Sequence, residues 1–181
     1  VGFTSMSEEM SPEALVDVLN GYFERATAVL GQHGATLDKF IGDAIMCFWN
    51  APLPQEDHAA RACLTALRLV AVVEQLAPEL EARGVARLHC RIGLNTGPGV
   101  VGNIGSRAAQ DYTVIGDTVN IASRVQDLTK VLGRSLLLTR ECREALGEDG
   151  ALEPLGAHFV KGRIQQLEVF GVAERDSRQA A

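Results

Sequence analysis

The sequence lacks cysteine pairs, an excess of positive charge and long apolar runs. None of its four cysteines stands at CxxC spacing, which argues against zinc and thioredoxin-type sites and favours buried free thiols in a reducing compartment. The net charge of −6 argues against a general surface for nucleic acid or anionic membranes, but it leaves room for a nucleotide site. No apolar run approaches the roughly 18 residues of a membrane span, and no signal peptide is visible.

The length is ordinary for a single globular domain. A chain of 181 residues is long enough for one well-packed domain and short for two. We expect this domain to cover residues 1–172 and a polar, frayed tail to cover residues 173–181. The chain begins at Val1, inside a predicted strand, so we expect it to be a segment of a longer protein.

Apolar periodicity predicts helices and strands in mixed order. The predicted helices are residues 12–30, opened by Ser11 and Pro12, then 57–83, 117–132 and 140–146. The predicted strands are a hairpin over 36–49, then 87–96, 100–104, 111–115, 135–139, and a last hairpin of 159–161 and 167–172 turned at Gly162. This order fits an α+β or α/β sandwich with a mixed sheet.

One glycine-rich stretch imitates a dinucleotide-binding motif. Residues 97–102 read GPGVVG, which matches GxGxxG, and Asp117 follows at a suitable distance. That motif must open a helix, however, and Val100 and Val101 begin what reads as another strand. We therefore predict a hairpin here and no dinucleotide site.

Two other stretches carry candidate chemistry. Residues 37–46 read LDKFIGDAIM, a tight hairpin with the Asp43 carboxylate at its tip, where it is either a solvated turn residue or a ligand for a hard cation. Residues 111–124 read DYTVIGDTVNIASR. In this stretch Asn120 and Arg124 share one face of the predicted helix, either as a surface polar pair or as part of a site.

Together the two stretches resemble the catalytic domain of class III nucleotidyl cyclases, and the resemblance runs from Val1 to about Val172. It implies an α+β cyclase homology domain, which is a mixed sheet with a ferredoxin-like core flanked by helices. It also implies conversion of ATP into 3′,5′-cyclic AMP and pyrophosphate. The family uses two Mg²⁺ or Mn²⁺ ions held by two aspartates. Asp43 matches one of them, and the other is expected two residues before Val1, outside this chain.

The resemblance also assigns residues to the nucleotide. Lys39 would donate to adenine N1, which favours ATP over GTP because a lysine cannot accept a hydrogen bond. Thr113 would accept a hydrogen bond from the adenine N6 amino group. In having threonine at this position, the chain resembles relatives that are stimulated by bicarbonate. Asn120 would orient the ribose and Arg124 would stabilise charge on the α-phosphate. The resemblance places Arg91 and Lys161 on phosphate oxygens.

The same resemblance implies a head-to-tail homodimer with its sites at the interface. One subunit would supply Asp43 and Arg91, and the other would supply the remaining site residues. We expect a catalytic domain in the cytoplasm, with an upstream sensor or a membrane-linked segment in the full-length protein.

Three alternatives stay open. A guanylate cyclase is disfavoured by Lys39, because guanine-specific relatives generally carry an acidic residue there. A regulatory domain without turnover is supported by the missing aspartate, whereas Asp43, Asn120 and Arg124 argue against it. A module that only binds nucleotide would need no arginine for the transition state.

Overall fold

The computed structural model describes residues 10–82, 89–147 and 152–172. Within these ranges the helices are α2 (Pro12–Gln32), α3 (His58–Glu81), α4 (Asp117–Leu132) and α5 (Arg140–Leu146). The strands are β1 (Thr36–Ile41), β2 (Ala44–Phe48), β3 (Ile92–Leu94), β4 (Val100–Gly105), β5 (Gln110–Ile115), β6 (Leu136–Thr139), β7 (Leu152–His158) and β8 (Leu167–Val172). The predicted α+β class is confirmed. The strand predicted at Val1 and the tail predicted at 173–181 lie outside the described residues.

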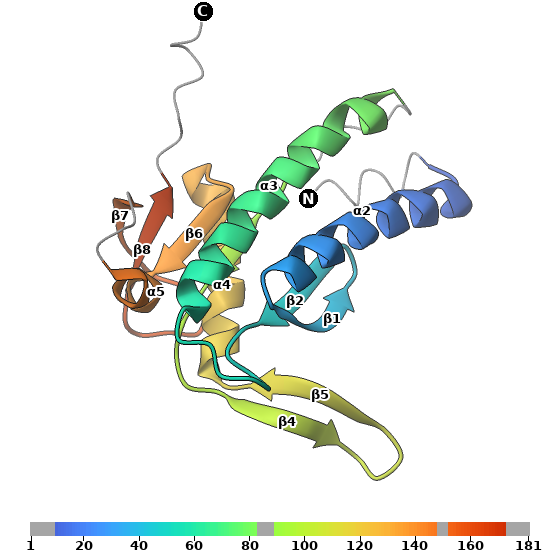
Figure 1. Ribbon diagram of the computed structural model, residues 1–181. Helices are drawn as coiled ribbons and strands as arrows, with labels where there is room; N and C mark the ends of the chain where they lie inside the picture. Colours follow the sequence, from blue (N-terminus) through green and yellow to red (C-terminus); the bar gives the residue numbers. More distant parts are fainter. Residues whose placement is uncertain (1–9, 83–88, 148–151, 173–181) are drawn as a thin grey trace, which may run out of the picture.

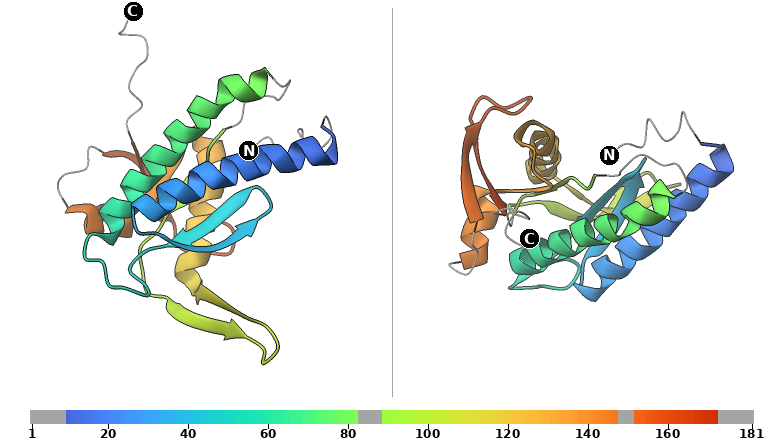
Figure 2. Two further views of the ribbon diagram at one scale, coloured as in Figure 1. Left: turned by 45° about the vertical axis from the view of Figure 1, so that its right-hand side comes forward. Right: turned by 90° about the horizontal axis from the view of Figure 1, so that it is seen from above.

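A four-stranded mixed sheet with helices on both faces forms the centre of the molecule. Its strand order is β3-β6-β8-β7, with β3 and β6 parallel and the other pairs antiparallel. Strand β6 is buried along its whole length because helix α4 covers one face of the sheet while α3 and α5 cover the other (Figures 1 and 2). Leu137 therefore packs with Val125 of α4, whereas Leu136 and Leu138 pack with Ala66 of α3.

Helices α2 and α3 lie side by side, and the β1–β2 hairpin packs against α2 (Figure 1). The hydroxyl oxygen of Ser11 accepts from the amide of Ala14 and caps α2 as predicted, and the helix continues two residues past its predicted end. The rings of Phe23 and Phe40, with centroids 4.3 Å apart, join α2 to β1. None of the helices in the described ranges is long and apolar enough to cross a membrane.

Strands β4 and β5 form an antiparallel arm that projects from the rest of the molecule (Figure 1). The stretch GPGVVG therefore leads into a strand and opens no helix, as predicted, but the predicted hairpin was wrong, because β4 pairs with β5 and not with the preceding strand β3. A side chain at Gly99 would place its Cβ 3.0 Å from Cγ2 of Val114, so this glycine lets the start of β4 approach β5 closely.

Two strand predictions were wrong. The strand predicted over 87–96 is regular only at Ile92–Leu94, and residues 87–88 lie outside the described ranges. The chain leaves the sheet at Asn95, whose side-chain amide donates to the carbonyl of Thr118 and accepts from the hydroxyl of Thr139. These bonds tie the end of β3 to α4 and β6.

The last hairpin also differs from its prediction. Its first strand is β7, Leu152–His158, and residues 159–166 form a loop before β8. Pro154 and Gly156 hid this strand from the sequence analysis, because both residue types weaken a strand pattern and mark irregular pairing. The pairing with β8 is indeed irregular between Pro154 and Ala157.

The contact between α4 and β3 depends on one glycine. A Cβ at Gly93 would lie 2.3 Å from the carbonyl oxygen of Ala122 and 2.3 Å from the amide nitrogen of Gln126, both backbone atoms of α4. Backbone atoms cannot rotate away as side chains do, so any side chain at Gly93 would push α4 off the sheet.

We expect Gly93→Ala to lower the free energy of unfolding by about 2–3 kcal/mol, because the added methyl group separates two packed layers. Gly21→Ala adds the same methyl group inside α2, where nothing lies within 4 Å, and is expected to stabilise by about 0.5–1 kcal/mol. Urea unfolding of both variants measures the difference. Equal stabilities would show that α4 and β3 can separate without cost.

Candidate active site

The two residues predicted to read the base, Lys39 and Thr113, meet at a carboxylate that the sequence analysis did not single out. The hydroxyl of Thr113 donates to Oδ2 of Asp38 over 2.6 Å, and the amide of Val114 donates to the same oxygen over 3.2 Å. Nζ of Lys39 lies 3.2 Å from the other oxygen, Oδ1. Asp38 thus links β1 to β5, which are 75 residues apart at this contact.

The carboxylate of Asp38 is shielded from solvent. Its side chain is completely buried, and Thr113 is only 7% exposed. Oδ1 of Asp38 lies close enough to Lys39 to form an ion pair, but within the described residues it accepts no hydrogen bond. Its attraction to Lys39 is therefore electrostatic. Burial, and secondly the negative charge of Asp38, raise the pKa of the neighbouring Cys47 thiol to about 12, so this thiol stays neutral near pH 7.

An irregularity in β1 explains how Asp38 and Lys39 come together. Strict alternation would place neighbouring side chains on opposite faces of the hairpin. The register with β2 shifts between Leu37, which faces Cys47, and Lys39, which faces Met46, so β1 carries one extra residue at Asp38. Such bulges redirect side chains, and this one lets the carboxylate and the ammonium group approach each other.

Helix α4 presents the two residues predicted to act on the ribose and the α-phosphate. Asn120 is exposed and Arg124, one turn later, is partly buried. Nη1 of Arg124 lies 3.6 Å from a carboxylate oxygen of Asp127, and the two side chains are 39% and 65% exposed, so the pair holds the guanidinium group only weakly. The predicted common face is thus confirmed as an accessible cationic and amide-bearing surface.

Lys161 is exposed in the loop between β7 and β8, which is anchored on both sides of the lysine. Val160 is buried against Val125 of α4 in the core of the sheet. Nη1 of Arg163 lies 3.2 Å from Oδ2 of Asp117, the first residue of α4. The loop is therefore tied to the helix that carries Arg124. The sequence analysis missed Arg163, although a second basic residue two positions after Lys161 could have indicated a role in this loop.

Asp43 occupies the tip of the β1–β2 hairpin, as predicted, after Gly42 with its φ of +61°. A hairpin-tip carboxylate suits Mg²⁺, which commonly takes one or two protein carboxylates together with phosphate oxygens. Within the described residues, no group of three or more potential metal-binding side chains gathers. The distance of Asp43 from Lys39 is at most about 13 Å along an extended strand.

Arg91 needs a correction. It was predicted inside a strand, but it lies directly before β3, in a partly buried segment without regular pairing. Arg91 lies two residues before Gly93, at which β3 packs against α4.

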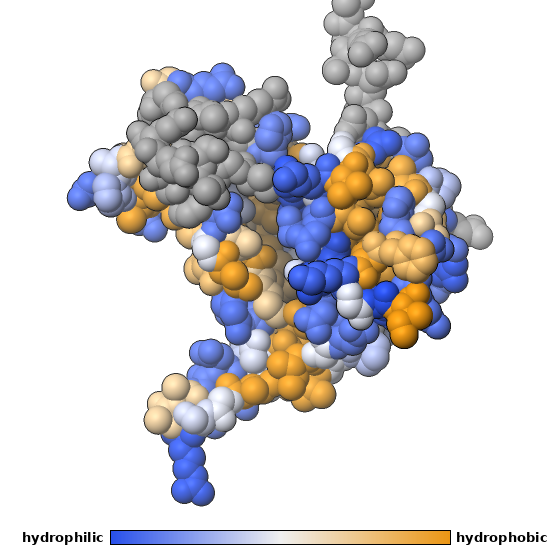
Figure 3. Space-filling model, turned by 180° about the vertical axis from the view of Figure 1, so that it is seen from behind, coloured by the Kyte–Doolittle hydropathy of each residue, from blue (hydrophilic) through white to orange (hydrophobic). Residues whose placement is uncertain are grey.

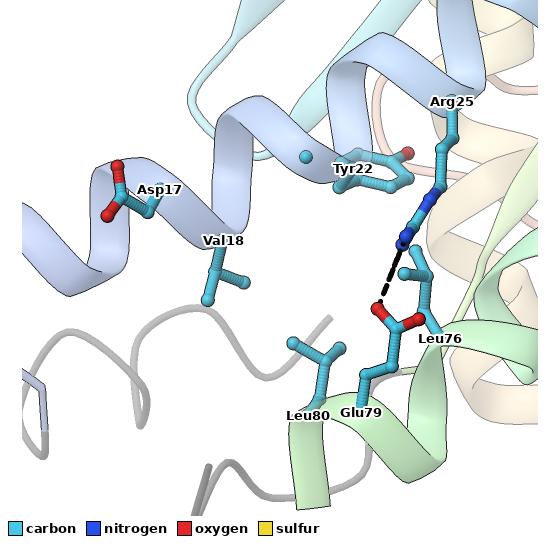
Figure 4. Close-up of a pocket in the computed structure, with 8 residues that line it drawn as sticks. Asp17, Val18, Tyr22, Arg25, Leu76, Glu79 and Leu80 are labelled. Atoms are coloured by element: carbon cyan, nitrogen blue, oxygen red, sulfur yellow. Dashed lines mark hydrogen bonds and ion pairs between the residues drawn. The ribbon is translucent and has the colours of Figure 1, made fainter. Parts of the chain in front are cut away.

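A separate hollow between α2 and α3 does not belong to this site. Its lining includes Tyr22, Val18 and Leu76, and the ion pair of Arg25 with Glu79, at 3.2 Å, lies beside it (Figure 4). Burial raises the pKa of the Tyr22 phenol, so the group stays protonated. The hollow brings together none of the predicted site residues.

The arrangement suits an anionic ligand with a heteroaromatic base. Lys39 offers a donor and Thr113 offers acceptor lone pairs at a closed, partly apolar place. Cationic and amide groups of α4 and of the loop between β7 and β8 offer binding to phosphates. Asp38 escaped notice in the sequence because an aspartate beside a lysine in a strand reads as a solvated pair.

The family model of the adenylate and guanylate cyclase catalytic domain matches residues 1–173. Adenylate cyclase 1 of Rhizobium meliloti (strain 1021) is 35% identical over 94% of this chain and 26% of its own length. The crystal structure of the adenylyl cyclase CyaB from P. aeruginosa superposes with a TM-score of 0.88, at 31% identity, over 97% of this chain and 90% of that one.

A guanylyl cyclase structure is similar as well. That of Cya2 superposes with a TM-score of 0.83, at 33% identity, over 97% of this chain and 90% of the other. The chain spans between 8% and 34% of the length of the first curated relatives it matches. Overall similarity therefore does not choose between adenine and guanine, and the choice depends on individual side chains.

We expect Arg163→Gln to release the loop that carries Lys161, because it removes the charge that holds the loop to Asp117. Amide hydrogen exchange of residues 159–166 should accelerate, while the free energy of unfolding should change by less than about 1 kcal/mol. Arg25→Gln, which breaks the remote pair with Glu79, is the matched control and should leave exchange in this loop unchanged. Unchanged exchange in both variants would show that Val160 alone fixes the loop.

Proposed function

The chain belongs to the adenylate and guanylate cyclase catalytic domain family, and we propose that it converts ATP into 3′,5′-cyclic AMP and pyrophosphate. The observation that carries the choice of ATP is the contact at Asp38. It brings the predicted adenine-reading residues, Lys39 and Thr113, to one buried carboxylate. Relatives named adenylate cyclase and the similarity to an adenylyl cyclase structure support the same reaction.

Base recognition follows from donors and acceptors. Adenine presents an acceptor at N1 and a donor at its N6 amino group, which match the ammonium of Lys39 and the hydroxyl oxygen of Thr113. Guanine presents a donor at N1 and an acceptor at O6, so both contacts would oppose it. A site built for one hydrogen-bonding pattern rejects the other because mismatched buried groups stay unpaired.

The chemical step is a displacement at the α-phosphorus, in which one bond to oxygen forms and another breaks. The ribose 3′ oxygen forms a bond to the α-phosphorus, the bond from that phosphorus to the pyrophosphate oxygen breaks, and the 3′ proton leaves to solvent. Asn120 would hold the ribose so that its 3′ oxygen faces the phosphorus. Arg124 would spread its guanidinium donors over the oxygens that gain charge during the attack.

The triphosphate needs further counter-charge. Lys161 would bind the terminal phosphates, and Arg91 would bind phosphate oxygens near the metal. Asp43 would be one ligand of Mg²⁺ or Mn²⁺, together with an aspartate upstream of Val1. When bound, the metal lowers the pKa of the 3′ hydroxyl and neutralises phosphate charge.

We propose that the active assembly is a homodimer in which each site takes residues from both copies. The hairpins that carry the site also carry exposed apolar side chains, of which Phe40 is 45%, Ile41 57% and Ile115 50% exposed. Apolar residues gather where the β4–β5 arm joins the rest of the molecule (Figure 3). A second copy would remove such a surface from water. An upstream sensor or membrane tether, and stimulation by bicarbonate, stay predictions from the resemblance.

The protein, with its upstream residues present, is expected to form cyclic AMP from ATP in the presence of Mn²⁺, and chelation of the metal should abolish product. Arg124→Ala should lower kcat by about 100-fold or more, because it removes transition-state charge stabilisation. Lys130→Ala removes a cation from the same helix and should stay within about twofold. Chromatographic separation of the products distinguishes cyclic AMP from cyclic GMP, and absence of both would falsify the enzymatic proposal.

Site sharing predicts complementation. Asp43→Ala and Arg124→Ala should each be nearly inactive alone, whereas an exchanged mixture should regain about one quarter of wild-type activity, since half the dimers keep one intact site. A mixture of Asn120→Ala with Arg124→Ala is the control and should stay inactive, because both residues come from the same copy. Recovery in neither mixture, with exchange of subunits demonstrated, would exclude a shared site of this kind.

A further inference from the structure

Asp38 contacts both predicted base-reading residues, and the resemblance assigns it no role. Its side chain, on β1, is completely buried and contacts β5 of the other hairpin. One of its oxygens accepts two hydrogen bonds, from Thr113 and Val114, and the other lies beside Lys39. A buried carboxylate costs much free energy unless its partners compensate, so this position has a strong physical requirement.

The direction of the hydrogen bond from Thr113 follows from chemistry. An ionised carboxylate has lone pairs and no proton to give, so in the 2.6 Å contact the threonine hydroxyl must be the donor. A hydroxyl has one proton. Once that proton points at Asp38, the oxygen of Thr113 presents only lone pairs to any other neighbour.

The second hydrogen bond fixes the geometry of the first. The amide of Val114 follows directly after Thr113 on β5 and donates to the same Oδ2 atom over 3.2 Å. Because this donor belongs to the backbone, the carboxylate cannot rotate away from β5 without leaving an amide unpaired. Thr113 is 7% exposed, so solvent has little access to reorient its hydroxyl.

We propose that Asp38 is a specificity-determining positioning residue that locks the Thr113 hydroxyl as an acceptor toward the base. A free threonine hydroxyl would adapt to either base, donating to guanine O6 or accepting from adenine N6. The locked hydroxyl accepts only, which admits the adenine amino group and opposes the guanine carbonyl. This inference rests on the proposed nucleotide cyclase function, and it concerns how the site chooses its base.

The substitution Asp38→Asn keeps the shape of the side chain and changes its hydrogen-bonding groups. The amide is nearly isosteric, but only one of its two terminal atoms accepts. If its oxygen faces β5, its NH₂ group faces the ammonium of Lys39, and if it is flipped, its NH₂ group faces the amide of Val114. Either orientation places donor against donor, and the flipped one frees the proton of Thr113 to donate to a base.

The measured quantity is the ratio of kcat/KM for ATP to kcat/KM for GTP. We expect Asp38→Asn to lower this ratio by about tenfold, which is the effect of one lost buried hydrogen-bond match. Thr113→Val should lower it as well, and Thr113→Ser should preserve it. In the Thr113→Val background, Asp38→Asn should change the ratio by less than about twofold, because no hydroxyl is left to lock.

The control is Thr65→Val. Thr65 is also a buried threonine whose hydroxyl donates over 2.6 Å, but it lies on α3 and donates to the carbonyl of Arg61. Its substitution should cost stability and leave the ratio unchanged. A purely structural Asp38 would behave likewise, with ATP and GTP rates falling together.

The outcomes separate the two proposals. Asp38→Ala removes the acceptor in every orientation, whereas Asp38→Asn can keep it if the amide oxygen faces β5. Wild-type protein that makes cyclic AMP, combined with an unchanged ratio in both Asp38→Asn and Asp38→Ala, overturns the lock and leaves the proposed function intact. An equal change with and without the Thr113 hydroxyl also overturns it. If the wild type makes no cyclic nucleotide, or if Asp38→Asn does not fold, binding of ATP and GTP is measured instead, by titration calorimetry on the wild type, Thr113→Val and Thr113→Ser. The lock requires that the binding preference for ATP falls in Thr113→Val and is kept in Thr113→Ser.

Discussion

The absence of a side chain at Gly93 lets α4 lie directly against β3, and most of the site depends on that contact. A Cβ at this position would collide with the backbone of α4 at both Ala122 and Gln126. These residues flank Arg124 in the sequence, so the close approach fixes the turn of helix that carries the guanidinium group. The start of the same helix is held by Asn95, through the carbonyl of Thr118, and by Arg163.

Strand β5 and helix α4 together act as one support for both ends of a nucleotide. Gly116 connects them with a φ of 152°, and the hydroxyl of Thr118 donates to the carbonyl of Pro98 over 2.6 Å. One end of this segment is bound by Asp38 and the other is packed on β3. In the proposed enzyme the base is read at the first end and the phosphates are bound at the second. The junction therefore sets the distance between recognition and chemistry.

The sequence predicted most elements because local patterns decide them. Ser11 and Pro12 open α2, and Gly42 turns the first hairpin, as expected from the conformations these residues favour. What failed depended on tertiary contacts. Asn95 ends β3 by bonding to two distant residues, and Pro154 and Gly156 lie in a strand that only its pairing with β8 reveals. Asp38 escaped for the same reason, since an extra residue in β1 is visible only against its partner strand.

The base-reading part of the proposed site is assembled within one copy of the chain, whereas the phosphate-binding part needs a second copy. Lys39, Asp38 and Thr113 are brought together within one copy of the chain, by contacts across two hairpins. Isolated two-stranded hairpins are marginally stable, so a buried hydrogen bond between them adds order where the base would bind. Asp43 and Arg91, by contrast, are proposed to act together with Arg124 of a second copy. In the proposed dimer, base recognition would thus be organised before association, whereas phosphate chemistry would begin only when the second copy closes the site.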